Sequence, residues 1–239
     1  MNKYKEIKTD KMLLNLKDIK KSFITEGSSK PRTVLDGISL NLDKGETVSI
    51  LGPSGSGKST LLNIIGALDK PDSGEVVFDG KTLSNKTDSE LTAFRNEEIG
   101  FVFQLHHLLP QCTVLENVLI PVLPLKDKSL RKSREQIAED LIKKVDLWPQ
   151  KDQKPNVLSG GECQRIAVIR ALINQPRLIL ADEPTGSLDE DNAMSIISLL
   201  LDLNKQFDTT LVVVTHSLAV SQRMEKTYTI HGGKLVHKS

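Results

Sequence analysis

The sequence predicts an α/β fold in which a buried parallel sheet with crossover helices is joined to an antiparallel β layer and an inserted block of helices. Three patterns support this prediction. Segments 177–181 and 210–215 are continuous apolar runs of strand length separated by a helical pattern, as in parallel sheets covered on both faces. Segments 14–16 and 38–42 alternate apolar and polar residues, which indicates half-buried antiparallel strands. Between about 104 and 175 the pattern becomes helical.

The first half of the chain adds further strands and one clearly marked helix. A loop containing Gly, Ser and Pro, Thr25–Arg32, separates the two alternating segments. Segment Thr47–Leu51 predicts a short strand that leads into a glycine-rich loop and then a helix whose buried side extends to Leu68. Further strands are expected at 75–78 and 99–103, and helices at 113–119, 129–145 and 161–173.

Length and composition indicate a single large domain spanning residues 1–239. Of the 239 residues, 38% are hydrophobic, which is enough to bury a substantial core. The helical block, about 105–175, is expected as a subdomain inserted within this domain, and residues 1–11 as a flexible tail without the apolar stretch of a secretory signal. Cys112 and Cys163 have no metal-ligand spacing near them, so reduced thiols in a cytoplasmic protein are expected.

Charge and hydropathy argue against two classes of protein. The 32 Lys and Arg residues nearly cancel the 31 Asp and Glu residues, so the chain has no global basic field and no nucleic-acid partner is expected. The most apolar run, Val118–Leu125, is short and is broken by two prolines, whereas a bilayer-spanning helix needs roughly 18–20 apolar residues. We therefore expect that the chain does not cross a membrane by itself.

The loop after the Thr47–Leu51 strand matches the phosphate-loop (Walker A) pattern, in which two glycines separated by four residues precede Lys and Ser or Thr. It consists of Gly52, Pro53, Ser54, Gly55, Ser56, Gly57, Lys58, Ser59 and Thr60. The glycines let backbone N–H groups point at phosphate oxygens, and the helix N-terminus adds partial positive charge. We expect Lys58 to bridge the β- and γ-phosphates of ATP and Ser59 to ligate Mg²⁺. The alternative is an ordinary glycine turn, which the flanking strand and helix disfavour.

A second motif is the apolar strand that ends in Asp182 and Glu183. Neighbouring strand residues face opposite ways, so the two carboxylates are expected to do different work. We expect Asp182 to hold the magnesium shell and Glu183 to act as the general base that orients and deprotonates the attacking water. Acidic residues at a strand end are also common as helix caps, and the phosphate loop upstream favours the catalytic interpretation.

A third motif opens the helix expected at 161–173. It consists of Ser159, Gly160, Gly161 and Glu162, preceded by Leu158. A serine and two glycines at a helix N-terminus make an anion site, yet the phosphate loop already cradles the chain's own nucleotide. This second site therefore requires a second nucleotide, contributed by another subunit. The alternative is a simple helix N-cap.

Together the motifs stand in the order and spacing of the ABC (ATP-binding cassette) transporter ATPase family, which the chain resembles over residues 13–235. The resemblance implies a P-loop NTPase with a RecA-like α/β core, an antiparallel β subdomain and an inserted helical subdomain. It identifies Gln104 as the Q-loop glutamine, which reaches Mg²⁺ and the attacking water, and Asp189 as the D-loop aspartate at the dimer seam. It also identifies His216 as the switch histidine that contacts the γ-phosphate. Phe23 falls where the family stacks an aromatic ring on adenine, with a core phenylalanine as the alternative.

Three segments, 23–34, 103–110 and 181–189, look like the lipoprotein-releasing and macrolide-exporter branch of this family. Residues 106–110 are most similar to the lipoprotein-releasing member. The sequence departs from the usual pattern of the family at Phe23, Glu162, Cys163 and Ser217. None of these departures removes a catalytic group.

The resemblance implies that two copies close head to tail around two Mg-ATP. Each site would join Lys58, Ser59, Gln104, Asp182, Glu183 and His216 of one copy to Ser159 and Gly161 of the other. Hydrolysis then separates the copies, because the γ-phosphate no longer links the two surfaces. The expected further partner is an integral membrane permease subunit, with a cytoplasmic helix entering a cleft beside Gln104. Leu105, Leu108 and Leu109 would edge this cleft, unless they are ordinary core.

Three classes of function remain. The first is the ATPase subunit of an exporter or lipoprotein-releasing complex, and the second is the ATPase of a non-transporting complex that drives cell-wall hydrolysis. In either case the chain is expected to be cytoplasmic and peripheral on the inner face of the cell membrane. The third, a soluble ABC protein acting on ribosomes or DNA, is disfavoured because such proteins usually carry two fused cassettes or long coiled-coil insertions.

Overall fold

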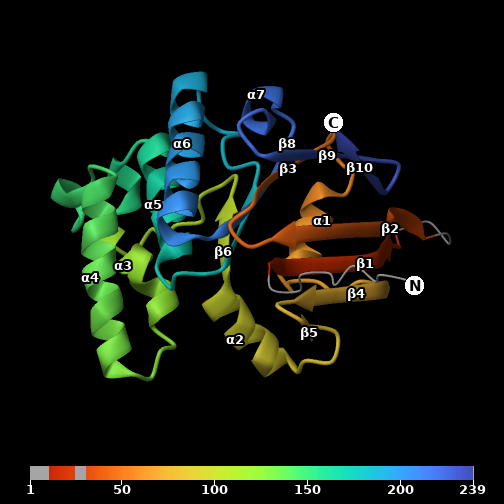
Figure 1. The fold of residues 1–239 in the computed structure, drawn as a ribbon. Helices are drawn as coiled ribbons and strands as arrows, with labels where there is room; N and C mark the ends of the chain where they lie inside the picture. Colours follow the sequence, from red (N-terminus) through yellow and green to blue (C-terminus); the bar gives the residue numbers. More distant parts are fainter. Residues whose placement is uncertain (1–10, 25–30, 239) are drawn as a thin grey trace, which may run out of the picture.

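Two β-sheets and a set of helices make up the fold in the computed structural model, which describes residues 11–24 and 31–238 (Figure 1). The smaller sheet contains β1 (Met12–Phe23), β2 (Arg32–Asp43), β4 (Ser73–Phe78) and β5 (Lys81–Thr82), in the order β2-β1-β4-β5. Its pairings are antiparallel, which confirms the expected β layer. The expected tail, apart from Lys11, and most of the expected loop between β1 and β2 lie outside the described residues.

The larger sheet has six strands in the order β10-β9-β3-β8-β7-β6. These are β3 (Thr47–Leu51), β6 (Ile99–Phe103), β7 (Leu178–Asp182), β8 (Thr210–Thr215), β9 (Lys226–His231) and β10 (Lys234–Lys238). Strands β9, β3, β8, β7 and β6 pair in parallel, and β10 pairs antiparallel with β9. The carboxyl ends of the parallel strands therefore meet at one edge, which is where ligands bind in such sheets.

The helices are α1 (Lys58–Ile65), α2 (Asp88–Glu98), α3 (Val114–Leu119), α4 (Lys128–Lys144), α5 (Gly160–Leu172), α6 (Glu190–Phe207) and the short α7 (Leu218–Ser221). The predicted helical stretch thus contains α3, α4 and α5, which contact one another at the left of Figure 1. The expected extension of the first helix to Leu68 is wrong, because α1 ends before Gly66 and Leu68 is exposed. Among the described helices, none has the length and apolar character needed to span a membrane.

Alternate residues of β7 face two different apolar clusters. Ile179 and Ala181 belong to a cluster with the inner faces of α3, α4, α5 and α6, whereas Leu178 and Leu180 belong to a cluster with α1 and the antiparallel sheet. All four side chains are fully buried. The strand that leads to Asp182, the predicted magnesium ligand, and Glu183, the predicted general base, is thus packed on both faces, as expected for a central parallel strand.

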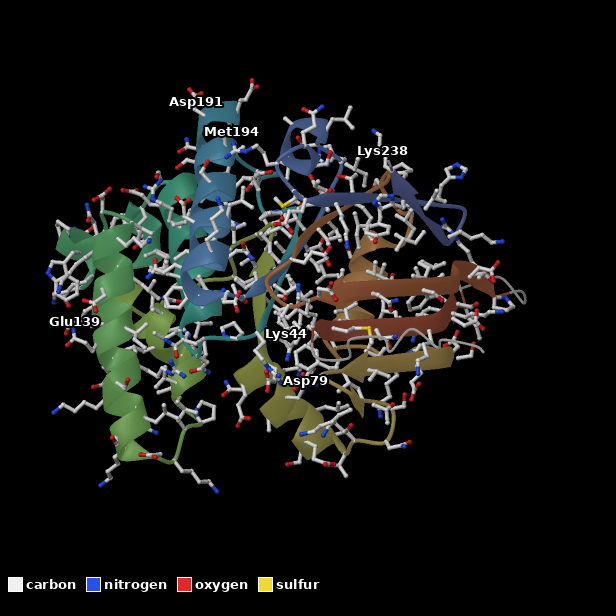
Figure 2. The ribbon with its side chains drawn as sticks, viewed as in Figure 1. Lys44, Asp79, Glu139, Asp191, Met194 and Lys238 are labelled. Atoms are coloured by element: carbon white, nitrogen blue, oxygen red, sulfur yellow. The ribbon has the colours of Figure 1, made fainter. Side chains whose placement is uncertain are left out.

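A network of ion pairs ties the start of β7 to the antiparallel sheet and α2. The Arg177 guanidinium donates to Glu98 at 2.6 and 2.9 Å and to Asp79 at 2.7 Å. Figure 2 shows Lys44 and Asp79 beside each other, where the lysine Nζ lies 3.3 Å from the carboxylate. Because Arg177 and Glu98 form two parallel hydrogen bonds, the pair fixes the orientation of the guanidinium and does more than bring opposite charges together.

Candidate active site

The phosphate loop connects the fully buried strand β3 to α1. Gly57, the residue before α1, has φ +103°, and a Cβ atom there would lie 2.9 Å from the side chains of Val34 and Leu35. No side chain caps the N-terminus of α1. The first N–H groups of this helix are consequently open to an anion, and their partial positive charge favours phosphate.

Lys58 is held within the loop. Its side chain is buried, and its Nζ donates to the carbonyl oxygens of Gly52 at 2.8 Å and Pro53 at 3.1 Å. The same ammonium lies 3.6 Å from a carboxylate oxygen of Glu183. These contacts place a fixed positive charge between the loop and the end of β7.

Asp182 and Glu183 both line the cleft, and they do not alternate as neighbouring residues of one strand would. Asp182 is the last residue of β7, whereas Glu183 has a left-handed φ of +46° and donates its N–H to the carbonyl of Val214. Strand alternation, the expected reason for their different roles, is therefore wrong. Left-handed backbone is costly for a non-glycine residue and is found at functional sites.

Burial raises the pKa of Asp182 above its ordinary value. A hydrogen bond with the Ser59 hydroxyl opposes this shift and lowers the pKa, whereas the negative charge of Glu183 raises it further. A partly buried carboxylate beside a hydroxyl is favourably charged only when a cation is near, because burial disfavours the ionised form.

Glu183 is also bound to His216, the residue that follows β8. The His216 Nδ1 lies 3.0 Å from a Glu183 carboxylate oxygen, and the His216 backbone N–H donates to the same oxygen at 3.3 Å. Glu183 is mostly buried, while the His216 ring is mostly exposed. Glu183 is thereby fixed between Lys58 and His216, with its carboxylate at the edge of the open cleft.

These groups line one cleft of about 790 Å³, large enough for a nucleotide. Its lining consists of Phe23, Arg32, Val34, Ser54, Gly55, Gly57, Lys58, Ser59, Thr60, Gln104, Asp182, Glu183 and His216. Phe23 is 44% exposed, so the alternative of a core phenylalanine is wrong. Arg32 and Val34 were not predicted. Strand pairing places Arg32 directly opposite Phe23, a register that no sequence motif indicates.

The remaining predicted residues do not line this cleft. Gly52, Pro53 and Ser56 belong to the loop but are not part of its lining, and a Cβ at Gly52 would lie 2.6 Å from the Ser56 hydroxyl. Ser159 to Glu162 begin α5, and Asp189 caps α6 by accepting from the Asn192 N–H at 2.9 Å.

The N-terminus of α5 is capped by its own side chains. Ser159 donates its N–H to the Glu162 carboxylate at 2.7 Å, and the Glu162 N–H donates to the Ser159 hydroxyl at 3.3 Å. The bonds with Ser159 lower the pKa of Glu162. The interpretation as a helix N-cap is therefore correct for this single chain. Gly161 lies against α6, because a Cβ there would approach Asn192 to 2.9 Å.

The cleft has the donors that magnesium prefers. Ser59, Asp182 and Gln104 offer a hydroxyl, a carboxylate and an amide oxygen, all hard ligands, in the lining of one cleft. Within residues 11–24 and 31–238, no cluster of three His, Cys, Asp or Glu side chains is arranged to hold a metal ion. The donors of Ser59, Asp182 and Gln104, with a single carboxylate among them, fit Mg²⁺, which usually binds through one or two carboxylates, waters and the phosphates of the substrate.

Comparison with known proteins places the chain in a family. The family model for the ABC transporter matches residues 35–186. The lipoprotein-releasing system ATP-binding protein LolD of Saccharophagus degradans is 48% identical over 211 residues, covering 88% of this chain and 91% of that protein. LolD of Bacteroides fragilis is 47% identical over 228 residues, covering 94% and 100%.

Solved structures agree with these sequence relatives. A dimeric bacterial ABC transporter cassette has a TM-score of 0.84 at 41% identity, covering 95% of this chain and 98% of that chain. A dimeric ATP-binding cassette in a post-hydrolysis state with ADP and Pi has the same TM-score at 40% identity and the same coverage. The fold, the phosphate loop and these matches lead to one conclusion: the chain belongs to the ABC transporter family and is one of its ATP-binding, ATP-hydrolysing subunits.

Proposed function

We propose that this chain works as a nucleotide-sandwiched homodimer that hydrolyses Mg-ATP to drive a separate membrane subunit in the release of lipoproteins. The observation that carries the proposal is the position of Glu183, whose carboxylate contacts both Lys58 and His216 in a cleft beside an uncapped phosphate loop. In the proposed arrangement residues 1–239 form one cassette, with about 105–175 as its helical subdomain.

In the mechanism we propose, the phosphate loop binds the triphosphate through its backbone N–H groups, and Lys58 bridges the β- and γ-phosphates. Phe23 stacks on the adenine. Ser59, Asp182 and Gln104 would hold Mg²⁺, which neutralises charge on the phosphates. Glu183 accepts a proton from the attacking water as the water oxygen bonds to the γ-phosphorus and the bond to ADP breaks. His216 contacts the γ-phosphate and orients Glu183.

The second half of each site comes from the other copy. Because Ser159 to Glu162 and Asp189 do not line the cleft of their own chain, we propose that they contact the nucleotide and the seam of the partner. The dimeric form of two similar cassettes supports this assembly. The Ser159 hydroxyl, whose oxygen accepts the Glu162 N–H in this chain, would donate its proton to a phosphate oxygen of the partner's nucleotide.

The membrane partner is expected to dock beside Gln104. Leu105 is 64% exposed and Leu109 is 40% exposed, so both can meet a helix of another chain, whereas Leu108 is buried in the core. Such a complex would hold the chain in the cytoplasm, against the inner face of the membrane. The LolD name shared by several relatives at 44–48% identity favours lipoprotein release over the cell-wall alternative.

The test replaces Glu183 by Gln, which keeps its shape and removes the base. Turnover should fall by roughly 10² to 10⁴ while Mg-ATP binding persists, so the variant should accumulate as an ATP-bound dimer. Hydrolysis rates and size-exclusion chromatography with light scattering, with and without Mg-ATP, measure both effects. Glu135→Gln, at an exposed position on α4, is the matched control and should behave as the parent.

Two outcomes would contradict parts of the proposal. Hydrolysis at the parental rate in Glu183→Gln would move the general base elsewhere, with His216 as the next candidate. An inactive variant that stays monomeric with Mg-ATP would show that closure requires the membrane partner.

A further inference from the structure

A basic segment surrounds the start of α4. Residues 126–134 contain five basic side chains and one acidic side chain, a net charge of +4 within a chain whose total is +1. We call this stretch the basic segment. Its single acid, Asp127, caps α4 by accepting the N–H groups of Ser129 and Leu130 at 2.8 and 3.2 Å. The segment itself therefore carries an excess of positive charge although the protein as a whole is nearly neutral.

The basic side chains of the segment fall into two groups. Arg131 donates to the carbonyls of Leu123 and Leu125, at 3.0 and 2.8 Å, and Arg134 donates to the carbonyl of Asn174 at 3.1 Å. These two arginines anchor the segment to its own protein.

Lys126, Lys128 and Lys132 form the second group. All three are exposed, and within the described part of the chain they form no salt bridge. Lys128 and Lys132 are four residues apart on α4 and share one face of the helix. These lysines are the side chains available to an anionic partner.

Exposed leucines accompany the lysines. Leu123, in the turn that Arg131 holds, is 67% exposed, and Leu130, in the first turn of α4, is 39% exposed. Cations beside exposed leucine at the end of a helix match the interfacial zone of a bilayer, where anionic headgroups lie next to acyl chains. A water-soluble acidic protein would satisfy the lysines and leave Leu123 unexplained.

The position of the segment agrees with this chemistry. Asn174, which accepts from Arg134, donates to the carbonyl of Pro121, and both residues line a pocket of about 220 Å³ together with Arg170. Arg170 in turn donates to the carbonyl of His106, next to the exposed Leu105. In Figure 1 the N-terminal end of α4 lies at the bottom of the molecule, as α2 does. The segment thus adjoins the surface on which a membrane subunit is expected.

We propose that the basic segment, with Leu123, binds the anionic phospholipid headgroups of the membrane surface. The chain would then contact the bilayer directly, in addition to its contact with a membrane protein. Each lysine near an anionic surface contributes about fivefold to the partition coefficient, so three together contribute about 100-fold.

The experiment measures sedimentation of the purified chain with vesicles of phosphatidylcholine, with and without phosphatidylglycerol, at low and high ionic strength. The parent should bind the anionic vesicles at low ionic strength and release them at high ionic strength. The variant Lys126→Gln/Lys128→Gln/Lys132→Gln should bind about 100-fold more weakly, and Leu123→Ser about tenfold more weakly.

A matched control removes the same charge elsewhere. Lys81→Gln/Lys205→Gln/Lys234→Gln changes exposed lysines on β5, α6 and β10 and should keep the parental partition coefficient within about twofold. Equal weakening by both triple variants would overturn the proposal, because any loss of charge would then suffice. Parental binding by the first triple variant, or equal binding to neutral and anionic vesicles, would overturn it as well. Unaltered ATP hydrolysis in solution shows that the variants are folded. Because the vesicles contain no membrane protein, a lack of vesicle binding would overturn this proposal and leave the proposed function untouched.

Discussion

Two helix N-termini are proposed to contact ATP, and they differ in how their N–H groups are satisfied. The helix α1 follows Gly57, which has a left-handed backbone and provides no side-chain cap. The helix α5 follows Ser159, which forms a reciprocal capping box with Glu162. The first end is open to a ligand, whereas the second is already partly satisfied by its own chain.

The difference in capping leads us to expect different roles for the N-termini of α1 and α5. An uncapped N-terminus beside a fixed lysine can bind phosphate in a single chain, because its N–H groups have no competing acceptor. A capped N-terminus is stable when exposed and contributes mainly the hydroxyl proton of Ser159, which a partner's nucleotide can accept. We therefore expect α1 to determine ATP affinity and α5 to determine whether two chains close.

The largest expected effect on this comparison comes from a change at α5, which should prevent closure of the dimer while leaving ATP binding by the monomer intact. Ser159→Arg places a long cation where the partner's nucleotide should lie, so hydrolysis should fall about 100-fold or more while the monomer still binds ATP. Hydrolysis rates and nucleotide titration measure the two properties. Thr113→Arg, at the corresponding position of the capping box of α3, is the control and should keep activity. Full activity in Ser159→Arg would disprove the composite site.

A smaller effect is expected at α1. Lys58→Ala removes a charge-assisted contact to the phosphates, which typically contributes about 1.5–3 kcal/mol, so ATP affinity should fall about 10- to 100-fold. Titration with a fluorescent ATP analogue measures the change, with Lys205→Ala on α6 as the control. Unchanged affinity in Lys58→Ala would refute the assignment of the phosphate loop.

The smallest effect concerns stability, and it tests the buried carboxylate beside α1. Because burial raises the pKa of Asp182 in the folded chain, its charge costs stability above that pKa, and the cost disappears as the pH falls to the ordinary range of an aspartate. Without nucleotide, Asp182→Asn should therefore raise the free energy of unfolding near pH 8 and have no such effect near pH 3. Urea unfolding at several pH values measures this difference. A variant that is less stable than the parent near pH 8 would contradict the stated cause.

Much of the fold could be predicted because its apolar patterns are strong. The continuous apolar strands β7 and β8 were predicted within about one residue of their bounds, whereas β1 and β2 extend well beyond the predicted alternating segments 14–16 and 38–42. The helix α2 was missed because Leu91 and Phe94 are its two buried residues and, apart from Ala93, the rest is polar. Its start carried a readable signal, since Thr87 and Glu90 form a capping box.

The C-terminal hairpin was missed for a related reason. Strands β9 and β10 are mostly exposed or half-buried, so their alternation is weak. Gly232 and Gly233, which connect them, both have positive φ and are a typical hairpin turn. The Gly-Gly pair could therefore have predicted the hairpin from the sequence, whereas hydrophobic periodicity could not.

Local motifs indicated the candidate site better than they indicated its geometry. The phosphate loop and the carboxylates after the β7 strand were predicted from their own residues, whereas Gln104 and His216 were assigned only through the resemblance to the ABC family. In the structure these groups line one cleft, because the carboxyl ends of parallel strands meet at one edge. The left-handed turn at Glu183 and the contact of Arg32 with the cleft depend on chain reversal and strand register. Neither is encoded in a short motif, so the structure was needed to see them.

The packing of β7 also limits how this chain can change in length. Its alternate residues contact two separate apolar clusters, Arg177 is paired just before the strand, and the carboxylates of Asp182 and Glu183 stand at its carboxyl end. Because side chains alternate with a period of two, inserting or deleting a single residue would exchange the faces of the strand and displace either the arginine or the carboxylates. We therefore expect insertions and deletions to be tolerated in the loops on either side of β7 and not within the strand.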